Sequence, residues 1–247
     1  MRSFISKHID LLQMIALALV PLTMVVCLFT NTEFAALLTT SVVVLSFVPF
    51  ILGLEQANLK PRHLMPIVVM AALGVAGRIL FLPIPSVQPV SAIVIITGAI
   101  FGKRSGFLTG MLAALISNIF LGQGPWTLWQ MYSWGLMGYI AGVLSRHGIL
   151  AGRNSVLVFS AIAPFFYGLI VDSYYVVGFV TERTIQAVLL AYSLGLMSSI
   201  AHSVSTVGVT ALIYLPWVRK LERIKRKYGI NDGSVREPEA QSTSPDS

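Results

Sequence analysis

The sequence NIFLGQGPWTLWQMYSWG, residues 118–135, joins two helix-length apolar segments at 105–121 and 128–145. Glycines and a proline at 122–125 shape the turn between them. Three tryptophans and several carboxamides surround this turn, where a membrane surface is expected. Indole rings and amides can stack on a planar polar ligand and form hydrogen bonds with it. The stretch therefore predicts a helical membrane hairpin with a ligand-like loop at its tip.

The composition assigns the whole chain to membrane proteins. Hydrophobic residues make up 55% of the chain and charged residues 11%, with a mean hydropathy of +0.80, which excludes a soluble domain. The single cysteine, Cys27, excludes an internal disulfide and a thiolate metal site. The first apolar run has no small-residue cleavage site after it, so we expect a retained helix rather than a signal peptide.

The predicted fold class is all-α, a polytopic membrane helix bundle. The expected spans are 9–30, 34–54, 65–83, 89–101, 105–121, 128–145, 155–180 and 187–217. The segment 89–101 is short for a hydrocarbon core of roughly 30 Å. We therefore expect neighbouring helices to shield it, and we expect it to end before it reaches both surfaces.

The basic residues predict that both termini lie in the cytoplasm. In that orientation, all but Arg78 and Arg183 of the 17 lysines and arginines fall on the cytoplasmic side. The exterior loops are then 31–33, 84–88, 122–127 and 181–186. Residues 219–228 form a basic helical extension, which suits anionic headgroups of the inner leaflet or, alternatively, a protein partner. Residues 229–247 are predicted to be disordered.

The sequence contains no pattern for catalysis or nucleotide binding. Residues 98–105 come closest to a phosphate loop, but Thr97 replaces its first glycine and Arg104 its hydroxyl residue. A tight cytoplasmic turn between two helices explains them better. Metalloprotease and nucleophile-elbow motifs are missing too. We predict a protein that is not an enzyme, takes no metal or cofactor, and depends on a partner for energy.

Small residues recur at four-residue spacing, which lets membrane helices approach closely. The stripes are Ala72 and Ala76, then Gly102, Gly106 and Gly110, then Gly138 and Gly142. We expect the glycines to pack the chain's own helices. The alanine pair can do the same or can dock another subunit, and the sequence does not decide between the two.

Several segments resemble the substrate-binding S component of energy-coupling factor (ECF) vitamin transporters, in particular the subgroup associated with cobalamin. They are 77–80, 85–90, 102–110, Asn118, 122–130, Asp172, 201–206 and 221–228. The resemblance covers roughly 65–228, and its tryptophan motif is the most specific part. Leu128 departs from the pattern, because relatives often have proline there.

The resemblance implies a six-helix S component that captures a vitamin from outside. Such a protein works with a membrane T component and two cytoplasmic ATPase subunits. Ala72 and Ala76 match the family's Ala-x-x-x-Ala contact with the T component. The implied organisation is an N-terminal pair of helices with a cytoplasmic loop at 1–64, a core at 65–228 and a tail at 229–247. The eight expected spans exceed six by the N-terminal pair, whose role stays open.

Two charged residues lie within predicted spans, where an unpaired charge costs about 2.5 to 3.5 kcal/mol on insertion scales. Arg78 is near the outer end of its span, and Asp172 is eight residues from the end of its own. Either they form a structural salt bridge with each other or they contact the ligand directly. The sequence leaves both interpretations open.

The predicted substrate-binding residues are Arg78, Gln88, Asn118, Gln123, Trp126, Trp129, Gln130, Asp172 and Tyr175. Simpler roles compete with ligand binding for many of them. The tryptophans and tyrosines could be interfacial belt residues, and the amides could cap broken helix ends. His202 is expected to be a hydrogen-bonded packing residue close to the cytoplasmic half.

The leading hypothesis is therefore capture of cobalamin or a related vitamin, with the loops at 84–90 and 122–130 closing over it. A self-sufficient ion-coupled secondary transporter is the first alternative. It would need buried carboxylates, and Asp172 is the acid placed deep in a span. A membrane-embedded enzyme or assembly scaffold ranks third.

Overall fold

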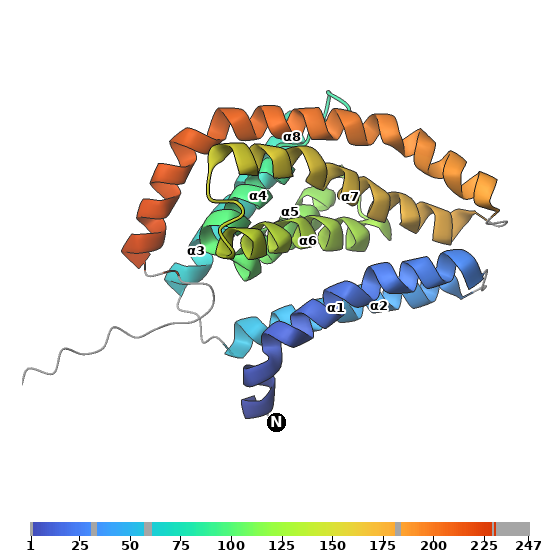
Figure 1. The fold of residues 1–247 in the computed structure, drawn as a ribbon, viewed down its shortest axis with the longest axis horizontal. Coiled ribbons are helices and arrows are strands. Elements are labelled where there is room, and N and C mark those ends of the chain that lie inside the picture. The colour runs from blue at the N-terminus through green and yellow to red at the C-terminus, as the bar shows by residue number, and fades with distance from the viewer. Residues whose placement is uncertain (1, 31–33, 57–60, 181–183, 229, 231–247) are drawn as a thin grey trace, which may run out of the picture.

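The protein is an all-helical membrane bundle in the computed structural model, which describes residues 2–30, 34–56, 61–180, 184–228 and 230 (Figure 1). Its helices are α1 (Arg2–Thr30), α2 (Ala35–Gln56), α3 (Pro61–Leu80), α4 (Pro89–Phe101), α5 (Lys103–Leu121), α6 (Trp126–Arg146), α7 (Arg153–Phe179) and α8 (Ile185–Tyr228). No strand occurs among these residues. The predicted fold class is confirmed, and each expected span corresponds to one helix, although the spans 34–54, 65–83 and 155–180 run one to three residues past a helix end. The predicted disorder of 229–247 concerns a tail that, apart from Ile230, lies outside the described residues.

Six helices, α1, α2, α3, α5, α7 and α8, are long and apolar enough to cross a membrane. With 13 residues, α4 covers about 20 Å, less than the hydrocarbon core. All of its residues except Ala99 are buried, so the expected shielding by neighbours is confirmed. The more polar α6 has 21 residues and is not among the six. Crossing of the whole bilayer by α6 stays a prediction, and so does the expectation that α4 ends before it reaches both surfaces.

Glycines bring α4, α5 and α6 into backbone contact. A Cβ atom on Gly106 would collide with the carbonyl group of Gly138, and one on Gly138 would collide with that of Gly106. Gly110 likewise lies against the backbone of Trp134, and Gly142 against that of Lys103. The glycine stripes therefore pack the chain's own helices, as the sequence predicted.

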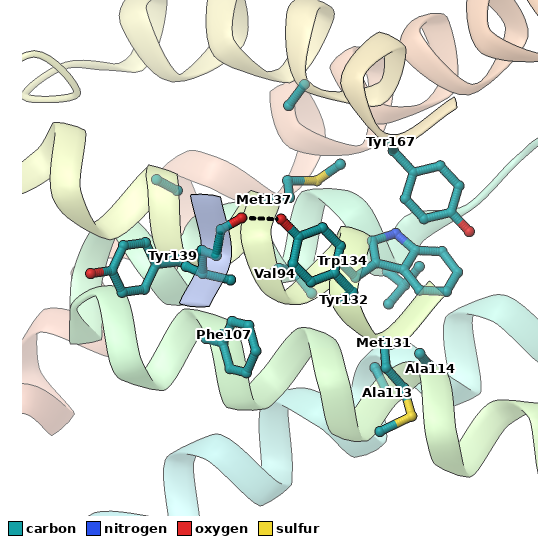
Figure 2. Packing of buried hydrophobic residues seen from close by; sticks show 14 of the residues in the cluster. Val94, Phe107, Ala113, Ala114, Met131, Tyr132, Trp134, Met137, Tyr139 and Tyr167 are labelled. Carbon is teal, nitrogen blue, oxygen red and sulfur yellow. Dashed lines mark hydrogen bonds between the residues drawn. The ribbon is translucent and has the colours of Figure 1, made fainter. Parts of the chain in front are cut away.

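The N-terminal helices α1 and α2 form a hairpin along one side of the other six (Figure 1). The Tyr132 hydroxyl of α6 donates a hydrogen bond of 2.6 Å to the Leu17 carbonyl of α1, the dashed line in Figure 2. The rings of Phe50 and Phe107 stack with centroids 3.5 Å apart. These contacts make the hairpin part of the packed core.

A charged contact fixes the beginning of α1 to the turn between α4 and α5. Asp10 pairs with Lys103 at 3.1 Å and with Arg104 at 2.7 Å. The turn itself is made by Gly102, whose φ of 94° is open to glycine but unfavourable for other residues. The interpretation of residues 98–105 as a tight turn is confirmed.

The last part of α8 bends across one end of the bundle (Figure 1). Helix α8 continues beyond the predicted end at 217 to Tyr228, and it contains Pro216, a residue that commonly kinks helices. Past the bend, Val218, Leu221 and Ile224 pack against Ile96, Ile100 and Phe101 of α4. We call this end, with its lysines and arginines, the basic end, and the opposite end, which carries the loops 81–88 and 122–125, the site end.

Candidate functional site

Arg78 lies in the last turn of α3 at the site end, and three hydrogen bonds hold its guanidinium group. Its Nη1 atom donates to Ser117 Oγ at 2.6 Å and to Asn118 Oδ1 at 2.7 Å. Its Nη2 atom donates to Gln130 Oε1 at 3.3 Å. The guanidinium carbon also lies 4.9 Å from the ring centroid of Trp134, a cation–π geometry. Neutral groups of α5 and α6 therefore solvate this charge inside the bundle.

Asn118 connects this arginine to the tryptophan loop. It is 1% exposed, and its amide nitrogen donates to Gln130 Oε1 at 2.8 Å and to Thr127 Oγ1 at 2.9 Å. The Thr127 hydroxyl in turn accepts a bond of 3.3 Å from the backbone amide of Gly124. We call Arg78, Ser117, Asn118, Thr127 and Gln130 the arginine network. Since both ends of the Asn118 amide are used, this side chain positions its neighbours.

The predicted salt bridge between Arg78 and Asp172 is wrong. Both residues are described, and no ion pair joins them, because the guanidinium group is turned toward α5 and α6 while Asp172 extends from α7 toward α8. Among the described residues, Asp172 has neither a hydrogen bond nor an ion pair. The alternative reading, contact with a ligand, stays a prediction for both.

A polar cavity of about 370 Å³, counting its solvent-open part, lies beside the arginine network. It is lined by Ser86, Gln88, Tyr167, Gly168, Val171, Asp172, Gly195, Ser198, Ser199 and His202. The loop 81–88 forms one wall, and α7 and α8 form the others. This set is called the polar cavity below.

Serines hold the loop 81–88 against α8. Ser86 and Ser198 share a hydrogen bond of 2.9 Å, and Ser205 Oγ donates to the Ser86 carbonyl at 3.3 Å. The backbone amide of Gln88 donates to Ser205 Oγ at 3.4 Å. Ser86 itself has a φ of 61°, which is rare for a residue other than glycine. The loop is thus held in an uncommon conformation at the mouth of the cavity.

An aromatic wall separates the arginine network from the polar cavity. Figure 2 shows the Tyr167 ring beside the indole of Trp134, with centroids 4.7 Å apart. The Trp134 Nε1 atom donates to Ser91 Oγ at 2.9 Å, and Ser91 bonds His202 Nε2 at 2.7 Å. The His202 ring also meets the edge of Tyr167 at 5.2 Å. One side of this wall contacts Arg78, and the other side lines the cavity.

The prediction for His202 is correct in part. The side chain is buried and hydrogen-bonded, as a packing residue should be. It lies beside Ser91 in the first turn of α4 and therefore at the site end, opposite to the basic end. Its expected place close to the cytoplasmic half stays a prediction, because it depends on the orientation in the membrane. His202 lies well inside α8 (Ile185–Tyr228), whereas Ser91 is near the beginning of α4 (Pro89–Phe101).

Four other predicted residues lie outside the network and the cavity. Trp129 is fully buried against Tyr174, with ring centroids 5.6 Å apart. Trp126 is 44% exposed, and its indole covers Gly124. Gln123 is exposed and donates to the Leu115 carbonyl, while Tyr175 is exposed and stacks on Phe179. Ligand contact by these four stays a prediction.

The sequence reasoning missed the polar face of α8. Ser198, His202 and Ser205 follow one another at spacings of four and three residues, and Thr206 comes four residues after His202, which places them on one side of a helix. That pattern was visible in the sequence. Tyr167 and Ser91 carry no comparable signal, since single polar residues in apolar helices are common.

Ala72 and Ala76 are exposed on the outer face of α3. The opposite face of the same helix packs inward, because Gly74 lies against Val90 and Ala113 and Gly77 lies against Pro89. The alanine pair thus does not pack the described part of the chain. Its role in docking a partner stays a prediction.

The described residues offer no metal site, because no three histidine, cysteine, aspartate or glutamate side chains gather in one place. The polar groups of the network and the cavity can instead bind a ligand through hydrogen bonds. They form two polar regions, one cationic and one anionic, on either side of Tyr167.

The chain is similar to membrane transport proteins. The family described as "ECF-type riboflavin transporter, S component" matches residues 58–222. The matched segment begins after the helices α1 and α2 and contains both the arginine network and the polar cavity. No solved structure matches the chain.

Three UPF0397 proteins are more distant relatives. One from Aliivibrio fischeri (strain MJ11) is 28% identical over 119 residues, which is 44% of this chain and 64% of the relative. One from Aliivibrio salmonicida (strain LFI1238) is 28% identical over 145 residues, 54% of this chain and 74% of the relative. One from Vibrio atlanticus (strain LGP32) is 29% identical over 91 residues, 35% and 50% of the two chains. The chain thus spans less than two thirds of the length of the Aliivibrio fischeri relative that it matches.

Proposed function

The chain belongs to the family of ECF-type riboflavin transporter S components. On this basis, we propose that it captures a vitamin on the exterior side of the cell membrane for import driven by ATP. A member of this family is a transporter component and not an enzyme. The observation that carries the proposal is the polar cavity at the site end, within the part of the chain that matches the family. It offers hydrogen-bonding groups in a bundle that is otherwise apolar.

Riboflavin is the first candidate ligand, and cobalamin is the second. The family's description supports riboflavin. The polar cavity also favours the smaller ligand, because it measures only about 370 Å³ with its solvent-open part included and a corrinoid is much larger than a flavin. The tryptophan motif at 122–130 supports cobalamin, since it resembles that subgroup of S components.

Thermal unfolding of the purified chain tests ligand capture. A ligand at 100 times its dissociation constant should stabilise the folded state by about 2.7 kcal/mol. We expect riboflavin to raise the unfolding temperature, with cyanocobalamin as the second ligand and biotin as a comparison. If neither riboflavin nor cyanocobalamin changes the unfolding temperature at 100 micromolar, capture of these vitamins is wrong.

A membrane T component and two cytoplasmic ATPases are the proposed partners. The exposed alanine face of α3, Ala72 and Ala76, is the proposed contact with the T component, and the hairpin of α1 and α2 leaves it uncovered. Ala72→Trp should abolish transport by the assembled complex and leave ligand binding unchanged. The matched control is Ala201→Trp, which alters an exposed alanine of α8. Loss of ligand binding in the α3 variant would contradict the proposal.

The proposed orientation has both termini in the cytoplasm and the site end outside. It rests on the distribution of lysine and arginine. Single cysteines at the exposed positions 84 and 220, in a Cys27→Ser background, test it with an impermeant maleimide. The cysteine at 84 should react in intact cells, and the one at 220 only after the membrane is opened. Equal labelling of both positions would contradict this orientation.

An ion-coupled carrier is the second candidate function, and the unpaired carboxylate of Asp172 favours it. Buried acids in transporters often carry protons. Vesicles that contain only this chain separate the two functions. Uphill uptake driven by a proton gradient would support the carrier, whereas uptake that requires the partner subunits and ATP would support the S component.

A further inference from the structure

The polar cavity is rich in hydrogen-bond acceptors that have no donor. The Gln88 Oε1 atom is buried and has no hydrogen-bond partner. Asp172 is half-buried, and its carboxylate has no partner among the described residues. A buried acceptor without a donor is costly, so native structures rarely keep one without a function. A buried acceptor and a half-buried carboxylate in one cavity, both without a protein donor, indicate that a ligand supplies the donors.

Two glycines make the approach of these polar groups possible. A Cβ atom on Gly195 of α8 would collide with the Asp172 carboxylate of α7. A Cβ atom on Gly168 of α7 would collide with the Ser199 hydroxyl of α8. Each helix thus presents a glycine to a polar side chain of the other. This arrangement leaves room for the carboxylate between α7 and α8 at the cavity.

No lysine or arginine lines the described cavity. Arg78, the charged group behind the aromatic wall, already makes three hydrogen bonds to Ser117, Asn118 and Gln130. The carboxylate therefore keeps its negative charge uncompensated on this side of Tyr167. A ligand with hydroxyl or ammonium donors would complement it, and a ligand with an anion would be repelled.

We propose that the polar cavity binds the donor-rich end of the vitamin and that Asp172 rejects forms carrying a phosphate or carboxylate there. For riboflavin, the donor-rich end is the hydroxylated side chain. The proposal rests on the proposed function, since it names the part of the captured molecule that this site recognises. It makes the chain selective for the free vitamin over its phosphorylated form.

Matched flavins test the proposal on the purified full chain. Lumiflavin lacks the hydroxylated side chain, and riboflavin 5′-phosphate adds an anion to it. The wild type should bind riboflavin about tenfold or more tightly than either analogue, because hydrogen bonds to a charged group and repulsion between like charges are both of that size. Asp172→Asn should lower the affinity for riboflavin by about tenfold. The affinities for riboflavin and for its phosphate should then lie within a few-fold of each other.

Two glycine variants separate this effect from a loss of fold. Gly195→Ala should displace the carboxylate and lower the preference for riboflavin over lumiflavin. Gly208→Ala, on the same helix with no atom nearby, should leave binding and the preference for riboflavin unchanged and should not lower the unfolding temperature. Unfolding of the variants without ligand shows whether each is still folded.

The outcomes distinguish the subsite from the function. If the wild type binds riboflavin and the folded Asp172→Asn protein keeps the same preference over the phosphate, the subsite is wrong while capture stands. If only cyanocobalamin or thiamine binds, the flavin assignment is wrong. In that case, a tenfold loss of affinity for that ligand in Asp172→Asn supports the subsite. An unchanged affinity in this variant overturns it. Binding of none of these compounds overturns both.

Discussion

Arg78 and Asp172 are both charged, both lie in transmembrane helices at the site end, and the protein treats them in opposite ways. Arg78 makes three hydrogen bonds and contacts the face of Trp134. Asp172 has no partner among the described residues and faces a cavity. Neighbouring helices bind the charge of Arg78, whereas the charge of Asp172 is left without a protein partner and faces the cavity. Free energy of unfolding and ligand affinity should therefore respond separately to changes at the two positions.

The largest effect on stability is expected from Arg78→Met. This change leaves Asn118 Oδ1 and Gln130 Oε1 without their charged donor, and each lost bond of that type is worth about 1.5 to 3 kcal/mol. The free energy of unfolding should fall by about 3 kcal/mol or more, measured by denaturant or thermal unfolding in detergent. Arg146→Met, an exposed arginine at the basic end, is the control and should have little effect. Equal effects would mean that Arg78 is not structural.

Asn118→Ala should follow, with a loss of about 2 kcal/mol. It removes one acceptor from Arg78 and the donor to Thr127, and it leaves a small cavity between α5 and α6. The same unfolding measurement applies, with the exposed Asn154→Ala as control. A stability equal to that of the control would show that the loop at 122–125 does not depend on the network.

Ser117→Ala should cost about 1 kcal/mol, since it removes one hydrogen bond of 2.6 Å to Arg78. Ser193→Ala is a suitable comparison, because that exposed hydroxyl bonds only the Leu190 carbonyl of its own helix. A difference between the two variants isolates the arginine contact. If Ser193→Ala costs as much, the bond to Arg78 contributes nothing specific.

Asp172→Leu should have the smallest effect on stability. Unlike the three other changes, it should not lower the free energy of unfolding appreciably and can raise it. Replacing an unpaired, half-buried charge by an apolar side chain removes its desolvation cost, so the unfolding free energy should stay within about 1 kcal/mol of the wild type or rise. The measurement is unfolding without ligand. A loss as large as that of Arg78→Met would contradict the contrast between the two residues.

The sequence predicted the helices well because apolar runs of this length have few alternatives in a membrane. It also predicted the turn at 98–105 and the packing role of Gly106 and Gly138. It could not predict how polar groups pair, since this depends on the rotation of each helix about its axis. The expected bridge from Arg78 to Asp172 failed for that reason: Arg78 is turned toward α5 and α6, and Asp172 toward α8.

The candidate site was predicted less completely than the fold. Arg78, Asn118 and Gln130 come together, and so do Gln88 and Asp172, but no pattern in the sequence indicated two separate regions. Trp129 is buried against Tyr174, a contact that the sequence did not indicate, and its stacking on a ligand stays a prediction. Burial of an indole in a loop-proximal turn depends on tertiary contacts that periodicity does not report.

The bent segment of α8 compensates for the short length of α4. It covers the last residues of α4 at the basic end, where a helix of only 13 residues stops short. Val218, Leu221 and Ile224 lie against Ile96, Ile100 and Phe101, so the chain itself supplies an apolar cap for this helix end. A helix too short for the hydrocarbon core can therefore stand inside the bundle without leaving its last turn uncovered.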